Sequence, residues 1–303
     1  MGFREILEFV RVEHTLFSLP FVLIGFVIAD NQFGTEYLDL VWIIAAAIGA
    51  RGLAMALNRI VDRDIDAENP RTASRHLPSG AMSMSSAWIL AASFLGVLLF
   101  SAWKLNEVAL KMAWLPVLAF VVYPFTKRIS WICHFWIGFC LALAPAGAWV
   151  AIAADTHGWG SITGQLEGGG EFLWFPEVFF VSLGVALWIT AFDINYALMD
   201  MDVDREQGIK SFPSTYNEEA TMWLSVALTV GWVSSFIMAG FEGYHLWAPS
   251  VLVMGLLNIN VVTRGARAAM EDEESMEIFQ RDLFRYSMLT GWVLLGSLYL
   301  LVQ

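Results

Sequence analysis

Charged residues are scarce in this chain. Asp, Glu, Lys and Arg make up only 15% of its 303 residues, whereas hydrophobic residues make up 57%. About a quarter of the residues in a soluble globular domain are charged, so this composition argues against a soluble protein and is typical of an integral membrane protein. Alternating ten-residue segments, the pattern of a transmembrane β-barrel, are also lacking. The spanning segments should be helices, because lipid offers an exposed backbone no hydrogen-bond partner.

Cysteine, histidine and basic residues are also few. The two cysteines, Cys133 and Cys140, lie seven residues apart in one apolar run, and no second pair accompanies them. We interpret them as small apolar residues, and their spacing together with five scattered histidines gives no sign of a zinc site. The net charge of −12 gives no sign of nucleic-acid binding.

Long apolar runs, in contrast, recur along the whole sequence. Each is long enough, or nearly so, to cross a hydrocarbon core of ~30 Å. The nine runs lie at 14–29, 38–57, 83–103, 108–125, 129–153, 172–199, 221–241, 245–263 and 283–302. They predict an all-α, polytopic membrane protein with nine transmembrane helices, in which residues 1–303 form a single domain. The amphipathic segment 1–13 should lie along the membrane interface.

The basic residues test this topology, because cytoplasmic loops are enriched in Lys and Arg. Fourteen of them fall in the N-terminal segment or near the loops after runs two, four, six and eight, against two on the other side. The fourteen are Arg4, Arg11, Arg59, Arg63, Arg71, Arg75, Lys127, Arg128, Arg205, Lys210, Arg264, Arg267, Arg281 and Arg285. We therefore expect a multi-pass protein of the plasma membrane whose even-numbered runs end on the cytoplasmic side.

Two motifs of oxygen-bearing side chains, spaced four residues apart, end the second and sixth runs. They are Asn58, Asp62 and Asp66 in residues 58–66, and Tyr196, Asp200 and Asp204 in residues 196–204. Side chains four apart on a helix share one face and are separated by ~6 Å per step. The repeated motifs should therefore lie at the same depth on the cytoplasmic side and face each other across a cavity.

Clustered carboxylates repel one another unless they share a cation. Mg²⁺ fits such a cluster, because it prefers oxygen ligands and completes its shell with water and substrate phosphates. Nearby basic side chains would hold the remaining phosphate oxygens. These are Arg75, Lys127, Arg128 and Lys210. The motifs predict a diphosphate clamp above an apolar cavity, in which Asp62 and Asp200 assist the metal-dependent loss of diphosphate from a polyprenyl diphosphate.

Arg51 and Asp193 form a second, deeper layer. Each lies seven residues before a motif position, Asn58 and Asp200 respectively, so both should face the same cavity. A charge inside a membrane helix is costly and usually faces a cavity or a partner. Two other readings remain open: that the acids and arginines only form a solvated face, or that Arg51 and Asp193 bind an organic anion in a secondary transporter.

Several segments resemble a known family. "NRIVDRDID", "RTASRHLPSG", "YPFTKRISWICHFWIG" and "FDINYALMDMDVDREQGIKS" are similar to signature segments of the intramembrane UbiA-type prenyltransferases, particularly their 4-hydroxybenzoate polyprenyltransferase branch, as is "RVEHTLFSLPF". The resemblance implies nine helices around a central cavity with a cytoplasmic cap. It assigns Mg²⁺ and diphosphate binding to Asn58, Asp62, Asp66, Asp200 and Asp204, and capping roles to Arg75, Lys127 and Lys210. His76 departs from the usual Arg-Pro-Leu-Pro form of the first loop.

The resemblance predicts Mg²⁺-dependent transfer of a polyprenyl group to an aromatic acceptor, 4-hydroxybenzoate, in quinone biosynthesis. Arg51 would grip the carboxylate of the acceptor, Asp193 would hold its hydroxyl, and Tyr196 would either orient an acidic ligand or simply pack. The ether-lipid branch of the same family, which prenylates geranylgeranylglyceryl phosphate, is the alternative acceptor class. The expected partners are a polyprenyl diphosphate, a small aromatic acid and the bilayer, and nothing points to nucleic acid or to an obligatory protein partner.

Overall fold

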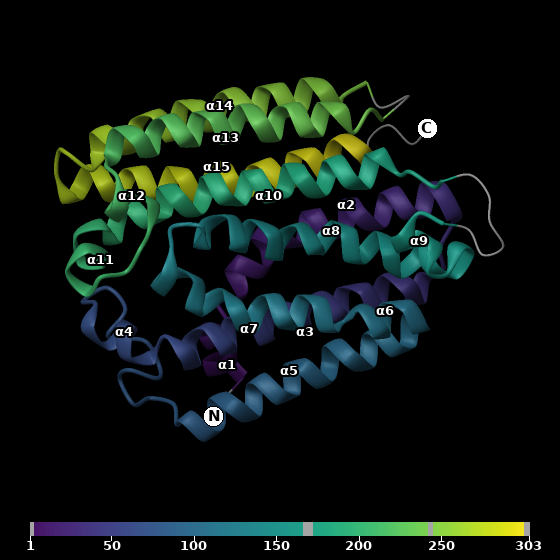
Figure 1. Ribbon diagram of the computed structural model, residues 1–303, viewed down its shortest axis with the longest axis horizontal. Helices are drawn as coiled ribbons and strands as arrows, with labels where there is room; N and C mark the ends of the chain where they lie inside the picture. The colour runs from purple at the N-terminus through teal and green to yellow at the C-terminus, as the bar shows by residue number, and fades with distance from the viewer. Residues whose placement is uncertain (1–2, 166–171, 242–244, 300–303) are drawn as a thin grey trace.

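Long helices running side by side make up the protein (Figure 1). The structure, a computed structural model, describes residues 3–165, 172–241 and 245–299, and these ranges contain helices but no strand. Nine long helical units occur within them. They are α2 (Val12–Phe33), α3 (Tyr37–Val61), α5 (Met84–Leu105), α6 (Glu107–Met112) with α7 (Trp114–Ile129), α8 (Cys133–His157), α10 (Pro176–Tyr196), α13 (Glu218–Met238), α14 (Trp247–Ala268) and α15 (Glu273–Tyr299). The all-helical prediction is confirmed.

Seven of these units, within the described ranges, are long and apolar enough to cross a membrane. The first of the seven begins at Thr15 in α2, and the last is α13. The other two long helices, α14 and α15, carry charged residues along part of their length, such as Arg264 and Asp282. Of the nine transmembrane helices predicted, seven thus meet both criteria in the described ranges, while α14 and α15 are long but less apolar, so the count of nine spans is approximate.

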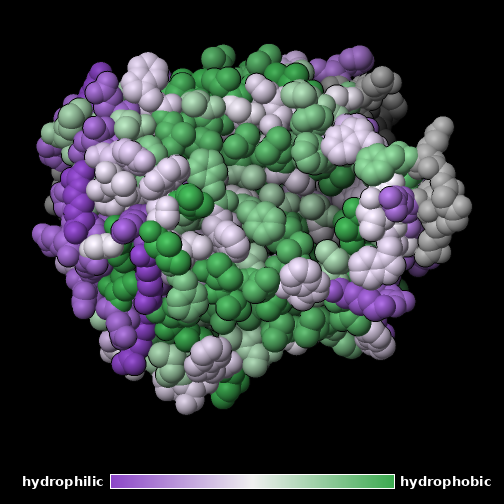
Figure 2. Space-filling model, viewed as in Figure 1, coloured by the Kyte–Doolittle hydropathy of each residue, from purple (hydrophilic) through white to green (hydrophobic). Residues whose placement is uncertain are grey.

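On the face shown in Figure 2, hydrophobic residues cover the middle of the molecule between its two ends. Hydrophilic residues gather at the end that carries α4 (Arg63–Glu68) and α11 (Met201–Gln207), whereas α9 (Gly160–Thr163) lies at the opposite end (Figures 1 and 2). Such a distribution suits helices that cross a bilayer and expose their ends to water. Both acidic motifs belong to the same hydrophilic end.

The largest hydrophobic core lies among α2, α8, α10, α13, α14 and α15, and includes the fully buried Trp149, Trp188 and Trp232. Helix α8 packs against both α2 and α10, and α3 packs against α5 and α7. Glycines allow two of these close contacts: a Cβ on Gly25 would lie 2.3 Å from the carbonyl oxygen of Pro145 in α8. A Cβ on Gly138 would lie 2.4 Å from Oγ1 of Thr190 in α10. The small residues therefore set the positions of the helices that frame the site.

The N-terminal segment forms the short helix α1 (Phe3–Phe9). Phe9 is fully buried, its carbonyl accepts a hydrogen bond of 2.8 Å from Nε of Arg59, and its ring meets His76 edge-on at 5.9 Å. Helix α1 thus packs against the end of α3 and the loop that follows it, in a second, smaller core with Leu53 and Leu77.

Candidate active site

The two acidic motifs lie at the same end of the bundle, each where a long helix breaks. Helix α3 ends at Val61, and Asp62, with φ −92° and ψ 6°, joins it to α4. Helix α10 ends at Tyr196, a 3₁₀ turn covers Ala197–Asp200, and Asp200, with φ −102° and ψ 6°, leads into α11. The expectation that each motif lies along one uninterrupted helix is wrong. The middle acid of each motif instead occupies a helix junction with nearly the same backbone conformation.

The side chain of Asp62 is almost completely buried, with 2% exposure, and is surrounded by donors. Its Oδ2 lies 2.6 Å from Nζ of Lys127 and accepts a hydrogen bond of 3.0 Å from the Asn58 amide. Arg128 lies 3.6 Å from Oδ1 and donates to the carbonyl of Val61 at 2.9 Å. Burial raises the pKa of the Asp62 carboxyl above its ordinary value, and the ammonium group of Lys127 opposes that rise.

Asp66 and Arg75 form a second buried ion pair. One guanidinium nitrogen of Arg75 donates to both carboxylate oxygens of Asp66, at 2.7 and 2.8 Å. The hydroxyl of Thr72 donates to the backbone carbonyl of Asp66 at 2.9 Å. The loop after α4 is therefore folded back onto the motif that precedes it.

Asp200 links the two motifs. Arg71, from the first loop, donates to it through two nitrogens, with an Nε–Oδ1 distance of 2.9 Å, and the Asn69 amide donates at 3.1 Å. The Arg71 guanidinium also lies over the ring of Tyr196, 5.7 Å from its centroid, and that ring stacks on Phe192. Sequence reasoning did not single out Asn69 or Arg71, because any of several arginines in this region could have been the partner of Asp200.

Asp204, the last acid of the second motif, and the second loop, residues 208–211 between α11 and α12 (Phe212–Thr215), complete the cluster. The carboxylate of Asp204 lies near the hydroxyl of Ser211 and close enough to Asp200 and Lys127 to feel their charges. The backbone N–H of Lys210 donates to the carbonyl of Lys127 at 2.9 Å, while the Lys210 side chain is exposed. The second loop is thus joined to the end of α7.

The donor set fits Mg²⁺ in chemistry, although the acids are not gathered around one point. Among the described residues, no three His, Cys, Asp or Glu side chains lie close enough to hold a metal ion. Asp62, Asp66 and Asp200 are instead each paired with a basic side chain. Yet Oδ1 of Asp62 is buried and accepts no hydrogen bond from the described part of the chain. A hard cation would satisfy that orphaned oxygen.

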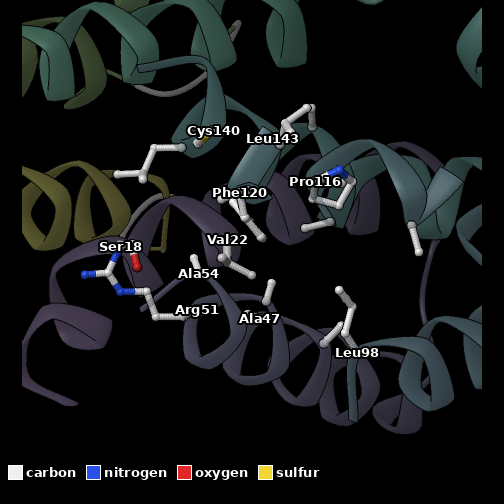
Figure 3. A pocket seen from close by; sticks show the side chains of 18 of the residues that line it. Ser18, Val22, Ala47, Arg51, Ala54, Leu98, Pro116, Phe120, Cys140 and Leu143 are labelled. Atoms are coloured by element: carbon white, nitrogen blue, oxygen red, sulfur yellow. The ribbon is translucent and has the colours of Figure 1, made fainter. Parts of the chain in front are cut away.

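A cavity of about 490 Å³ extends from the motif end into the bundle, lined by residues of α2, α3 and α5–α9 (Figure 3). Its polar end includes Asn58, Arg51 and Tyr123, and most of its remaining wall is apolar as far as Leu105 and Ile162 at the opposite end. Figure 3 shows the Arg51 side chain in the cavity beside Ser18. Nε of Arg51 is buried and finds no hydrogen-bond partner in the described ranges.

The structure separates Asp193 from Arg51, which the sequence predicted to face one cavity. Asp193 does not occur among the described residues that line the cavity. It lies near Tyr123, which does line it. Oδ2 of Asp193 is 2.7 Å from Nδ1 of His134, at the start of α8. The Asp193 side chain points toward α8, because α10 packs between α8 and α13.

Comparison with known proteins assigns this arrangement to a family. Residues 18–288 match the profile of the UbiA prenyltransferase family. A UbiA homolog from Aeropyrum pernix K1, in an apo structure, is 28% identical, with a TM-score of 0.77 over 95% of this chain and 98% of that chain. A UbiA homolog from Archaeoglobus fulgidus bound to GPP and Mg²⁺ has the same fold, with 18% identity and a TM-score of 0.63 over 96% of this chain and 99% of that chain. The chain belongs to the UbiA prenyltransferase family.

Curated relatives give the same family. A 4-hydroxybenzoate octaprenyltransferase from Aliivibrio salmonicida (strain LFI1238) is 29% identical over 172 residues, which cover 57% of this chain and 54% of that protein. The chain spans about half the length of the curated relatives it matches. The resemblance noted in the sequence is therefore confirmed at the level of the family.

Proposed function

We propose that this protein transfers a polyprenyl group from a polyprenyl diphosphate to an aromatic acceptor, 4-hydroxybenzoate, with Mg²⁺ as the metal. The observation that carries this proposal is the position of the acidic and basic side chains at the mouth of a long apolar cavity, with Arg51 inside its polar end. The octaprenyltransferase relative and the GPP- and Mg²⁺-bound homolog support it.

The ion pairs of the site are suited to exchange partners on substrate binding. Lys127, Arg75 and Arg71 each hold a carboxylate, and the same cations match phosphate oxygens in charge and geometry. Arg128 and Lys210 are exposed beside them and extend the phosphate-binding set. Once these side chains turn to the diphosphate, their former partners are free to act as metal ligands. Together with Asn58 and Asp204, the released Asp62, Asp66 and Asp200 would form the metal site, and bound Mg²⁺ would neutralise the charge that develops on the leaving diphosphate.

The cavity would hold the prenyl tail, and its apolar wall would keep water away from the allylic cation. The acceptor would enter the polar end, where Arg51 offers a planar, bidentate donor to the carboxylate. Asp193 lies outside the cavity lining but near Tyr123, which belongs to that lining, and from there it would accept a hydrogen bond from the acceptor hydroxyl and raise the nucleophilicity of the ring. Tyr196 contacts the Arg71 guanidinium, so it would help to place Arg71 beside Asp200.

The direct test is to incubate the purified protein with Mg²⁺, radiolabelled geranylgeranyl diphosphate and a panel of acceptors, and to analyse the lipid-soluble products. We expect a prenylated 4-hydroxybenzoate that forms only when a divalent metal is present. A product formed with geranylgeranylglyceryl phosphate but with no hydroxybenzoate would place the protein in the ether-lipid branch. No adduct with any acceptor, together with substrate flux in liposomes, would indicate a transporter.

We also propose that the site faces the cytoplasm from the plasma membrane. Position 210 lies at the motif end and position 163 at the opposite end, and both side chains are exposed. In spheroplasts, a membrane-impermeant maleimide should label a T163C variant and leave K210C unlabelled until the membrane is broken. Cys133 and Cys140 are buried, so the parent protein serves as the background control. The reverse labelling pattern would show that the site faces outward.

A further inference from the structure

His134 lies between Asp193, the acid proposed to hold the acceptor, and Phe212, which follows the loop after α11. Its side chain is buried, with 3% exposure, at the first turn of α8. On one side, Nδ1 lies 2.7 Å from Oδ2 of Asp193 in α10. On the other side, the backbone N–H of Phe212, the first residue of α12 (Phe212–Thr215), donates to Nε2 at 3.0 Å. Both ring nitrogens are therefore used.

These two contacts fix the tautomer of the imidazole. A backbone N–H can only donate, so Nε2 must present its lone pair to Phe212. The ring proton then belongs to Nδ1, which donates to the carboxylate of Asp193. Such a neutral, oriented imidazole leaves Oδ1 of Asp193 available to another donor. The carboxylate is partly exposed, with 23% accessibility, and lies near Tyr123 at the polar end of the cavity.

The backbone around Phe212 connects this pair to the phosphate-binding side chains. Lys210, two residues earlier, donates its backbone N–H to the carbonyl of Lys127 at 2.9 Å, and Lys127 binds Asp62. The hydroxyl of Thr190 donates to the carbonyl of Ala186 at 2.7 Å, and its oxygen lies 3.2 Å from the carbonyl oxygen of His134, so α10 packs closely against the backbone of His134. The imidazole is thus held by Asp193 on one side and by the backbone of Phe212 on the other.

We propose that His134 is a positioning residue for prenyl transfer: its Nδ1–H orients the Asp193 carboxylate toward the acceptor hydroxyl, while Phe212 holds its Nε2. This inference rests on the proposed function, since it gives a role to the acid that would hold the acceptor. It predicts that losing the hydrogen bond from Nδ1 to Asp193 lowers turnover. Losing the hydrogen bond from Phe212 to Nε2 should lower only the stability of the loop between α11 and α12.

Two amide substitutions separate these roles. In His134→Asn, the side-chain amide replaces the Nδ1–H donor but offers nothing to Phe212. In His134→Gln, the amide oxygen reaches the position of Nε2 and accepts from Phe212, but no donor faces Asp193. We expect His134→Gln to lower kcat for 4-hydroxybenzoate about ten- to a hundredfold with an unchanged KM for the prenyl diphosphate. His134→Asn should keep most of the turnover and lose thermal stability.

A stability control and a double variant complete the kinetic test. Thr290→Val removes a buried hydrogen bond to Asn258 in α14, far from the motifs in the sequence, and should lower the melting temperature without changing kcat. Asp193→Asn combined with His134→Gln should be no slower than Asp193→Asn alone, because both changes disrupt one interaction. If His134→Gln keeps full turnover, or if both histidine variants lose activity only in step with their melting temperatures, His134 has no positioning role.

Nitrogen-15 spectra of histidine-labelled protein test the geometry independently of activity. We expect the His134 signals of an Nδ1–H tautomer that changes in Asp193→Asn. An Nε2–H tautomer, or a doubly protonated ring, overturns the proposal. Failure of the proposed function has a different signature, since wild-type protein would then form no prenylated aromatic product at all, whereas failure of this inference leaves that product in wild type and in His134→Gln alike.

Discussion

Replacing Asp62 with alanine should abolish most prenyl transfer and leave a folded membrane protein. Asp62 is 2% exposed, binds Lys127 at 2.6 Å and has one oxygen that accepts no hydrogen bond from a described residue. The substitution removes a ligand of the proposed metal and leaves the Lys127 ammonium group without its carboxylate. We expect kcat to fall by about 10²–10³-fold or more, the range typical for losing one electrostatic group that stabilises the transition state. Asp200→Ala should behave in the same way, because Asp200 occupies the equivalent helix junction.

Asp202→Ala provides the matched control for these variants. Asp202 lies two residues from Asp200 in the same motif, but its side chain is 84% exposed and pairs only with Arg205 among the described residues. Its loss should change neither turnover nor Mg²⁺ binding. Isothermal titration of each variant with Mg²⁺ and inorganic diphosphate measures the binding step directly. If Asp62→Ala and Asp200→Ala still bind diphosphate in an Mg²⁺-dependent manner as tightly as the parent, these acids are not part of the clamp.

The pairing of the acids with Lys127, Arg75 and Arg71 has a physical reason. A carboxylate as buried as that of Asp62 is strongly destabilised unless a cation lies beside it. In the structure the protein's own bases provide that charge. If diphosphate binds these bases, as we propose, the carboxylates would lose their partners and their affinity for a divalent cation would rise. Metal and diphosphate should therefore bind with positive coupling, and each should strengthen the other by the same factor.

The sequence alone identifies the elements that depend on spacing and composition. The repeated motifs at 58–66 and 196–204 do lie at one end of the bundle, because both follow helices that run in the same direction. Arg51 does line the cavity, because a charge well inside the apolar helix α3 has few other places to go. These features follow from helix periodicity and from the cost of burying charge in lipid.

Features that depend on contacts between distant segments were not predictable. Arg71 and Asp200 are 129 residues apart, and no local pattern pairs them in preference to Arg75 or Arg63. The break of α3 at Asp62 occurs without proline or glycine at the junction, so it leaves no local signal. His134 appeared as an isolated histidine in an apolar run. Its role depends on how α8 packs against α10, which the Gly138–Thr190 contact determines.

Arg51→Ala should raise the KM for 4-hydroxybenzoate far more than the KM for the prenyl diphosphate. Arg51 lies in the cavity beyond Asn58, and its Nε makes no hydrogen bond within the described structure, so the guanidinium is available to a ligand. A charged hydrogen bond contributes about 1.5–3 kcal/mol. Its loss corresponds to a rise in KM of roughly 10- to 150-fold. The KM for the prenyl diphosphate should change little, because the side chains proposed to bind its phosphates, Lys127, Arg75 and Arg71, lie with the acidic motifs at the mouth of the cavity.

The acceptor itself supplies the control for this prediction. 4-Hydroxybenzyl alcohol has the same ring and hydroxyl but no carboxylate, so Arg51 should not distinguish it from other phenols. Wild-type protein should prefer 4-hydroxybenzoate to the alcohol, and Arg51→Ala should lose that preference. Arg51→Lys should retain part of it, since the ammonium group keeps the charge but not the bidentate geometry. If Arg51→Ala raises the KM values for both acceptors and for the prenyl diphosphate equally, Arg51 shapes the cavity and does not recognise the carboxylate.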